Sequence, residues 1–212
     1  MFGSLTPRVE RGATPRRARG DDGAAMVEAA IVMPLLMLLV FGIIEWGLAF
    51  LTATSTNSAA RSGARTASAL TLNTTYAAQA VLAVQQNLTG AIPFATPLEM
   101  WVYRVPPPVN PASPTANELK GYPEGQTSWV CGTNCIKYTW DGNSFVYASG
   151  TWPVAQMHVC NVTIDQFDGV GVYLKVRHNF VTNFFGSSKI ISEHTVMRLE
   201  PQPTDACAAA AS

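Results

Sequence analysis

The sequence is dominated by an unbroken apolar run at residues 29–51, AAIVMPLLMLLVFGIIEWGLAFL. Its single charged side chain, Glu45, stands beside Trp46 and is expected at the outer membrane interface, where tryptophan is enriched. A helix of this length spans roughly 35 Å, more than the ~30 Å hydrocarbon core of a bilayer. A buried helix of a soluble domain is the alternative, but runs this long and apolar are typical of membrane spans. We therefore predict one transmembrane helix at residues 24–51.

Basic residues are concentrated before the apolar run. Arg61 and Arg65 follow it, whereas five arginines precede it: Arg8, Arg11, Arg16, Arg17 and Arg19. Because the cytoplasmic flank of a membrane helix carries the excess of Arg and Lys, residues 1–23 are predicted to be cytoplasmic and the later residues extracytoplasmic. The leader 1–23 is rich in Arg, Pro and Gly without an apolar period, which predicts disorder.

A cleaved secretory signal is the competing interpretation of the same segment. Such signals have an apolar core of about 7–15 residues and a small-x-small exit. Here the core is longer, contains Pro34 and Glu45, and is followed only by the weak match Ala53-Thr54-Ser55. These features favour a retained span.

The helix is expected to continue beyond the membrane as an outer helical segment, residues 52–90. From Thr52 to Leu88 there is no proline and one glycine, Gly63, and the many Ala and Ser residues let helices approach closely. Asn73-Thr74-Thr75 predicts a break followed by a capped helix. After the break, apolar residues recur at helical spacing, which predicts an amphipathic helix that packs on the outer domain: Tyr76, Ala77, Ala80, Val81, Leu82, Val84 and Leu88.

The remaining residues predict a β-rich extracytoplasmic domain at 91–205 and a flexible tail at 206–212. Prolines between 106 and 114 indicate a loop in polyproline geometry. Strand-like runs occur at 136–140, 144–148, 157–164, 171–181 and 190–199. Asp141-Gly142-Asn143 between the first two is a hairpin signal. The fold class is therefore α+β: a long N-terminal transmembrane helix that continues into an outer helix, then a small β-rich globular domain.

None of the cysteines lies in the predicted cytoplasmic or membrane part of the chain. An even number of cysteines outside the cytoplasm permits disulfides, but four of them allow three pairings, and the sequence does not choose among them. A zinc site is the alternative, with His158 beside Cys160 as a loose candidate pair. We favour disulfides or free thiols among the four: Cys131, Cys135, Cys160 and Cys207.

Two segments carry a family resemblance. GAAMVEAAIVMPL at residues 23–35 resembles the opening of the TadE-like family, minor pilin-like proteins of Tad (Flp) pilus systems, in which a G-x-x-x-V-E-[FA]-A-hydrophobic-P pattern leads into the membrane helix. NSAARSGAR at residues 57–65 is similar to the family's next stretch. Weaker similarity returns at 172–180 and 192–200. The resemblance implies a pilin-like fold.

The resemblance also implies processing of the N-terminus. Pilin-like precursors are cut after a glycine by a membrane aspartic prepilin peptidase. Gly23 would then be the last leader residue, Ala24 the first mature residue, and Glu28 the typical glutamate at the fifth mature position. In an assembled bundle the Glu28 carboxylate could meet the Ala24 ammonium of a neighbouring subunit. Alternatively, Glu28 lies at headgroup depth and needs no partner.

Four further residues are candidates for helix packing and assembly. Pro34 is expected to kink or soften the membrane helix, because it leaves the carbonyl four residues earlier without its hydrogen bond. Gly63 lies in the small-residue segment where helices can approach closely. Arg61 and Arg65 share one helical face and are expected either to contact an acidic partner or lipid phosphates, or to be solvated.

Several functional classes are disfavoured. The 14 basic and 14 acidic residues balance, and nucleic-acid domains usually carry a basic surplus. The sequence has no G-x-S-x-G, H-E-x-x-H or Walker pattern, and its three histidines are scattered. We therefore expect no enzyme activity, cofactor, metal, nucleic acid or small-molecule substrate.

The function implied is that of a minor pilin or pseudopilin that takes part in assembly of a Tad/Flp-type pilus. Its expected partners are the lipid bilayer, other pilins, Tad assembly proteins and the prepilin peptidase. The expected location is a bacterial cell membrane, crossed once. The alternative is an uncleaved, membrane-anchored accessory protein or adhesin of the pilus or secretion apparatus.

Overall fold

The computed structural model describes residues 21–88, 94–108, 131–160, 166–202 and 207. The chain divides into two compact units, Met1–Ile43 and Ile44–Ser212, which we describe separately. The predicted leader up to residue 20, the prolines at 111 and 114, and the tail apart from Cys207 lie outside the described residues.

Helix α1 (Asp21–Ala69) is 49 residues long and contains Pro34. Proline lacks the N–H that would bond to the carbonyl of Ala30, but the helix continues on both sides of it. Within the first unit, all side chains from residue 23 to residue 41 are exposed. In the described part of the chain, α1 is the one helix long and apolar enough to cross a membrane.

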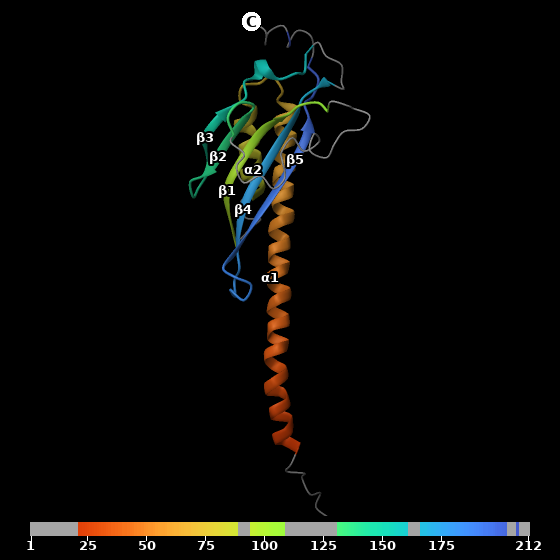
Figure 1. Cartoon of the computed structure of the whole chain (residues 1–212), viewed down its shortest axis with the longest axis vertical. Coiled ribbons are helices and arrows are strands. Elements are labelled where there is room, and N and C mark those ends of the chain that lie inside the picture. The colour runs from red at the N-terminus through yellow and green to blue at the C-terminus, as the bar shows by residue number, and fades with distance from the viewer. Residues whose placement is uncertain (1–20, 89–93, 109–130, 161–165, 203–206, 208–212) are drawn as a thin grey trace, which may run out of the picture. The chain divides into compact units, whose positions relative to one another are not determined.

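The second unit contains a five-stranded sheet of order β3-β2-β1-β4-β5, in which all neighbouring strands are antiparallel (Figure 1). The strands are β1 (Ala95–Val105), β2 (Cys135–Trp140), β3 (Phe145–Thr151), β4 (Gly169–Asn179) and β5 (Ser188–Arg198). A short 3-10 helix, η1 (Val154–Gln156), follows β3. The α+β class predicted from the sequence is confirmed.

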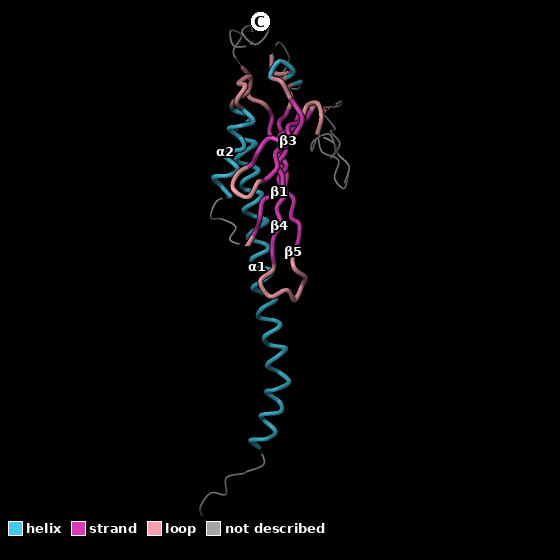
Figure 2. The backbone as a smooth tube through the Cα atoms, turned by 90° about the vertical axis from the view of Figure 1, so that its left-hand side faces the viewer, coloured by secondary structure: helices cyan, strands magenta, loops and turns pink. Residues whose placement is uncertain are grey.

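Helix α2 (Tyr76–Leu88) and the part of α1 within the second unit cover one face of the sheet (Figure 2). Asn73 forms a turn just before α2, in which its side-chain oxygen accepts the backbone N–H of Thr75 at 2.9 Å. The predicted apolar stripe of α2 is buried, except that Leu82 is exposed. The main core therefore combines small α1 residues with larger residues of α2 and the sheet: Ala59, Ala60, Ala64, Ala67, Tyr76, Val84, Met100, Val102, Val172 and Leu174.

Two features of the sheet differ from expectation. The central strand, β1, was not among the strands predicted. The strand predicted at 157–164 is wrong over its described part, because residues 157–160 are irregular. Met157 and Val159 are buried and His158 between them is exposed, so they imitate strand alternation, but the chain here packs on the core as a loop after η1. Residues 161–164 lie outside the described part.

Candidate functional site

The predicted processing residues lie at the start of α1. Gly23, Ala24 and Glu28 are all exposed, and a Cβ added to Gly23 would have no atom within 4 Å. The Gly23–Ala24 bond falls in the first turn of the helix, where the N–H groups have no partner within the helix. Unwinding that turn therefore breaks few hydrogen bonds.

Glu45 is the one charged residue of the apolar run, and it is fully buried. Its carboxylate accepts the backbone N–H of Val181 at 3.1 Å and that of Thr182. Both donors belong to the loop between β4 and β5, residues 180–187, which we call the β4–β5 tip. The sequence predicts Glu45 at the outer membrane interface. In the structure, these two hydrogen bonds attach the β4–β5 tip to α1 beside residue 45.

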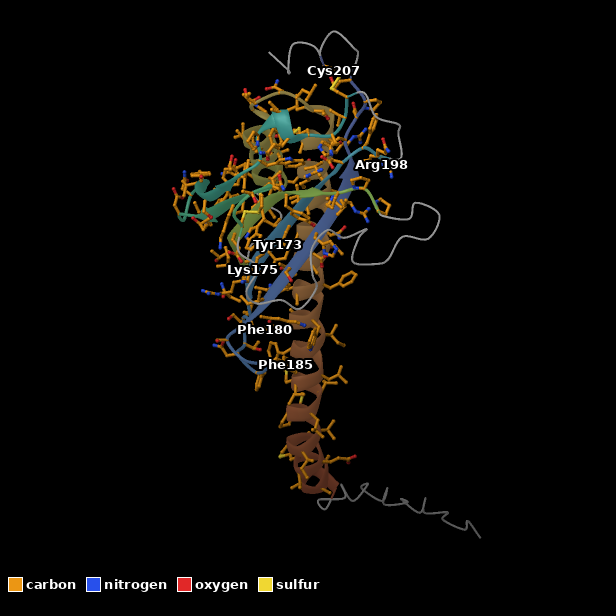
Figure 3. The ribbon with its side chains drawn as sticks, turned by 45° about the horizontal axis from the view of Figure 1, so that its top comes forward. Tyr173, Lys175, Phe180, Phe185, Arg198 and Cys207 are labelled. Atoms are coloured by element: carbon orange, nitrogen blue, oxygen red, sulfur yellow. A yellow bond between two sulfur atoms is a disulfide. The ribbon has the colours of Figure 1, made fainter. Side chains whose placement is uncertain are left out.

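Aromatic rings reinforce this attachment. The Trp46 ring lies 6.5 Å from the Phe180 ring and 6.2 Å from the Phe185 ring, measured between centroids. Figure 3 shows Phe180 and Phe185 at the end of the sheet next to α1. The Lys189 ammonium lies over the Trp46 ring, 4.9 Å from its centroid, in a cation–π arrangement.

A buried polar pair lies one to two helical turns further along α1. The Thr52 hydroxyl is 2.9 Å from His178 Nδ1 and 3.0 Å from the carbonyl of Leu48. The hydroxyl has one hydrogen, and if it is directed to Leu48, Nδ1–H of the ring donates to Thr52. Nε2 of His178 is then a buried acceptor without a partner. Burial lowers the pKa of His178, and the negative charge of Glu45 opposes that shift.

Gly63 of α1 packs directly against α2. A Cβ added there would be 2.6 Å from Val84 Cγ2, 3.3 Å from the carbonyl oxygen of Ala80, and 3.6 Å from Val172 Cγ1. Distances of this kind leave no room for a methyl group at residue 63 unless Val84 moves. The glycine thus permits contact among two helices and the sheet, which is a packing role inside this subunit.

Arg61 and Arg65 flank Gly63 but point outward. Both are exposed, and neither forms an ion pair with any residue that the structure describes. The two guanidinium groups are therefore available to an external partner. Gly23 and Glu28 belong to the first unit of the chain, and the two arginines belong to the second.

The cysteines form two disulfides. Cys131 pairs with Cys135, four residues apart, and we call this the β2 disulfide; Cys160 pairs with Cys207, 47 residues apart. Asn134 adopts a φ of 60° in the short loop between the first pair. Because the Cys160 sulfur is bonded to another sulfur, the alternative of a zinc site with His158 finds no support. Among the described residues, no group of three His, Cys, Asp or Glu side chains could hold a metal ion.

Sequence reasoning missed a buried carboxylate next to the second disulfide. Asp168 is fully buried and accepts Arg104 Nε at 2.8 Å and the His158 backbone N–H at 2.8 Å. Arg104 also contacts the His158 ring at 2.9 Å. This cluster joins the end of β1 to the start of β4. Asp168 is closed off from solvent, so the arrangement is one of structural support.

The comparisons with known proteins give one result. A family model described as TadE-like protein matches residues 23–65, which include both predicted motifs, the one at 23–35 and the one at 57–65. The resemblance predicted from the sequence is thereby confirmed over this segment. No curated protein and no solved structure matches the chain. The match and the apolar helix together fit a membrane protein associated with a Tad pilus.

Proposed function

We propose that this chain, whose residues 23–65 match the TadE-like family, is a minor pilin or pseudopilin that takes part in assembly of a Tad/Flp-type pilus. It acts without catalysis, by packing its membrane helix against other pilins and by displaying its outer domain. The observation that carries this proposal is the joint occurrence, on one exposed helix, of the Gly23–Ala24 bond, Glu28 and the apolar run.

The exposed surface of α1 supports an assembly role. Apolar side chains from Met26 to Phe41 are exposed in the described part of the chain. In the membrane such a surface faces lipid, and in a bundle it faces other helices. Cleavage after Gly23 would place a new ammonium group at Ala24, four residues from Glu28 along the same helix. That carboxylate is exposed, so it can pair with the ammonium of a neighbouring subunit.

The arginine count on the two sides of the span supports an orientation with the leader in the cytoplasm and the sheet domain outside. Two disulfides within the sheet domain agree with an oxidising, extracytoplasmic location. In this arrangement the prepilin peptidase meets the Gly23–Ala24 bond on the cytoplasmic side, and the outer domain, with Arg61 and Arg65, meets pilus components on the other.

The test is the mature N-terminus of the protein expressed with its own pilus machinery. We expect sequencing to begin at Ala24. Gly23→Leu should leave the full-length precursor, because the peptidase requires the glycine, while insertion of the untouched apolar run continues. Gly47→Leu is the matched control, since Gly47 also has no atom within 4 Å of an added Cβ but lies away from the cleavage site.

Other starting residues would count against this function. A start at Met1 in the presence of an active peptidase would favour the alternative, an uncleaved membrane-anchored accessory protein or adhesin. A start near residue 54 would mean that the apolar run is a secretory signal. Co-purification of the mature chain with sheared pili, compared with the membrane fraction, would then separate a fibre subunit from an assembly factor that stays in the membrane.

A further inference from the structure

The β4–β5 tip exposes large apolar side chains. Phe184 is 64% exposed, Val181 56% and Phe185 45%. No residue of the tip, 180–187, carries a charge. Two turn positions with positive φ, Asn183 at 59° and Gly186 at 102°, shape the loop so that these side chains project from it. Exposure of these apolar side chains to water is unfavourable, so the sequence of the tip favours an apolar environment.

The tip lies beside residues 45 and 46 of α1. Glu45 accepts two of its backbone N–H groups, and Trp46 contacts two of its rings. Both residues belong to the last two turns of the apolar run that ends at Leu51. If a bilayer surrounds the apolar run, its outer interface therefore lies at the level of the β4–β5 tip.

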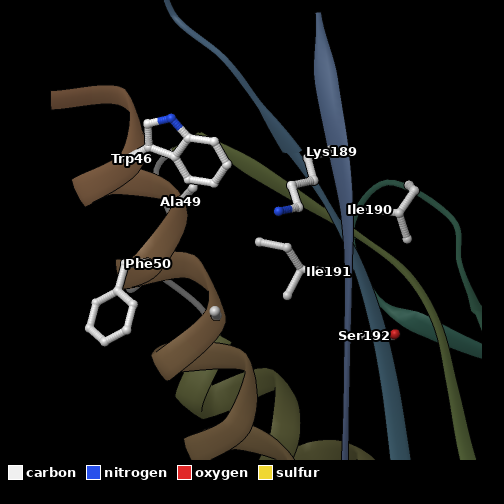
Figure 4. A pocket seen from close by; sticks show the side chains of 8 residues that line it. Trp46, Ala49, Phe50, Lys189, Ile190, Ile191 and Ser192 are labelled. Carbon is white, nitrogen blue, oxygen red and sulfur yellow. The ribbon is translucent and has the colours of Figure 1, made fainter. Parts of the chain in front are cut away.

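A groove continues the apolar surface between α1 and β5. It has a volume of about 400 Å³ and is lined mainly by apolar side chains, with Lys189 at one end (Figure 4). In Figure 4, Lys189 and Ile191 point towards α1, and Trp46 lies on the side of the helix that faces them, whereas the Phe50 ring points away from β5. Phe50 is 71% exposed, so α1 also presents an apolar side chain to its surroundings at the level of this groove.

Two basic residues lie next to the apolar tip. Arg177 and Lys189 lie on the two strands just above it, and both are exposed. The carboxylate that contacts the tip, Glu45, is buried and bonded to the tip backbone. Aromatic side chains with flanking Lys or Arg are the composition that anchors proteins at the membrane interface, where the cations meet lipid phosphates.

We propose that the β4–β5 tip is a second membrane contact, which inserts Phe184, Phe185 and Val181 into the interfacial region of the leaflet on the side of the sheet domain. Arg177 and Lys189 lie at the level of the phosphates. The domain is thus held against the bilayer by α1 and by the tip, so that it cannot tilt or rotate freely about the helix. The occupant of this surface is phospholipid. The inference rests on membrane insertion of α1 and is independent of any role in a pilus.

The test uses the full chain in vesicles of phosphatidylcholine and phosphatidylglycerol whose acyl chains are brominated near the headgroup end. Bromine quenches tryptophan that lies in the bilayer. Phe184→Trp keeps an aromatic ring in the tip and adds one reporter to the five native tryptophans. We expect loss of most of the emission that Phe184→Trp adds over the wild-type chain.

Two further variants make the result decisive. Tyr147→Trp is the matched control, because Tyr147 is 63% exposed on β3 at the other edge of the sheet and should keep its added emission. Leu36→Trp lies within the apolar run and should lose its added emission, which shows that α1 is inserted. Quenching of Leu36→Trp without greater quenching of Phe184→Trp than of Tyr147→Trp would overturn the proposal. Concentration-dependent association of the chain through an unquenched tip would instead assign this surface to a second copy.

Discussion

Replacing Gly63 with alanine should push α1 and α2 apart where Gly63 contacts α2. The new methyl group would lie 2.6 Å from Val84 Cγ2, which is closer than two carbon atoms can approach. Val84 is fully buried and its β-branched side chain has little rotamer freedom. Adding a methylene to a packed core costs about 1–3 kcal/mol, while alanine in place of glycine gains about 1 kcal/mol in a helix. We expect Gly63→Ala to lower the free energy of unfolding by about 0–2 kcal/mol.

A double-mutant cycle isolates the steric part of this net change in unfolding free energy. Val84→Ala deletes the methyl group that would clash, so in that background Gly63→Ala keeps its gain in helix propensity and meets only the milder 3.3 Å approach to the Ala80 carbonyl oxygen. The coupling energy between the two substitutions should be about 1–3 kcal/mol. The assay is denaturant unfolding of the full chain in detergent, followed by tryptophan fluorescence.

Gly47→Ala serves as the control, because an added Cβ there meets no atom within 4 Å and should not destabilise the sheet domain. If Gly63→Ala changes stability equally in the wild-type and Val84→Ala backgrounds, steric contact with Val84 is not what the glycine relieves.

Three further predictions follow from the buried groups. Glu45→Ala should speed hydrogen exchange of the two tip amides that it accepts by about tenfold or more, with Glu45→Gln intermediate; unchanged exchange would contradict the attachment. Burial lowers the pKa of His178 below its ordinary value of about 6.5. Just below that pH the unfolded chain therefore binds more protons than the folded chain does. Tm should then fall as the pH drops from 7 towards the folded-state pKa. His178→Gln should flatten that slope, and an equal slope in both proteins would refute the assignment. Replacing Cys160 and Cys207 by serine should cost about 3–4 kcal/mol of unfolding free energy, against about 2 kcal/mol for loss of the shorter β2 disulfide; equal losses in denaturant unfolding would argue against the loop-length explanation.

Local patterns predicted the helical part and much of the sheet. The apolar run, the Asn73 break and the stripe of α2 are each visible within a few helical turns, and they correspond to α1 and α2. The runs at 136–140 and 144–148 fall in β2 and β3, and the alternation after Gly171 falls in β4. Such features depend on neighbours in sequence, so sequence patterns detect them.

The central strand was missed because its charges find partners only in the folded sheet. Glu99 in β1 pairs with Lys137 at 2.7 Å and with Lys175 at 3.1 Å, one on each neighbouring strand. Arg104 pairs with Asp168 at 2.8 Å. In sequence these charges limit the apolar run of β1 to residues 100–103, which are buried without alternation. In the sheet they are neutralised by residues from distant parts of the chain, which no local pattern indicates.

The candidate sites divide in the same way. The motif from Gly23 to Glu28 was found because it is contiguous, and the family match includes it. The bond from Glu45 to the tip joins residues 136 positions apart, so its sequence signal was limited to one carboxylate in an apolar run. The inward-facing role of Gly63 likewise became visible only when α2 and β4 were placed beside it.

The strand order has a consequence for synthesis of the chain. β1 lies at the centre of the sheet, but its long partner β4 follows only after residue 168, with β2 and β3 made in between. At about 5–20 residues per second, the ribosome needs roughly 3 to 13 s to pass from the end of β1 to the start of β4. During that interval one edge of an apolar strand has no neighbour, although α1 is already available for membrane insertion. A translation product that stops before β4 therefore carries an open β edge next to the membrane, and it is a natural substrate for chaperones and quality-control proteases.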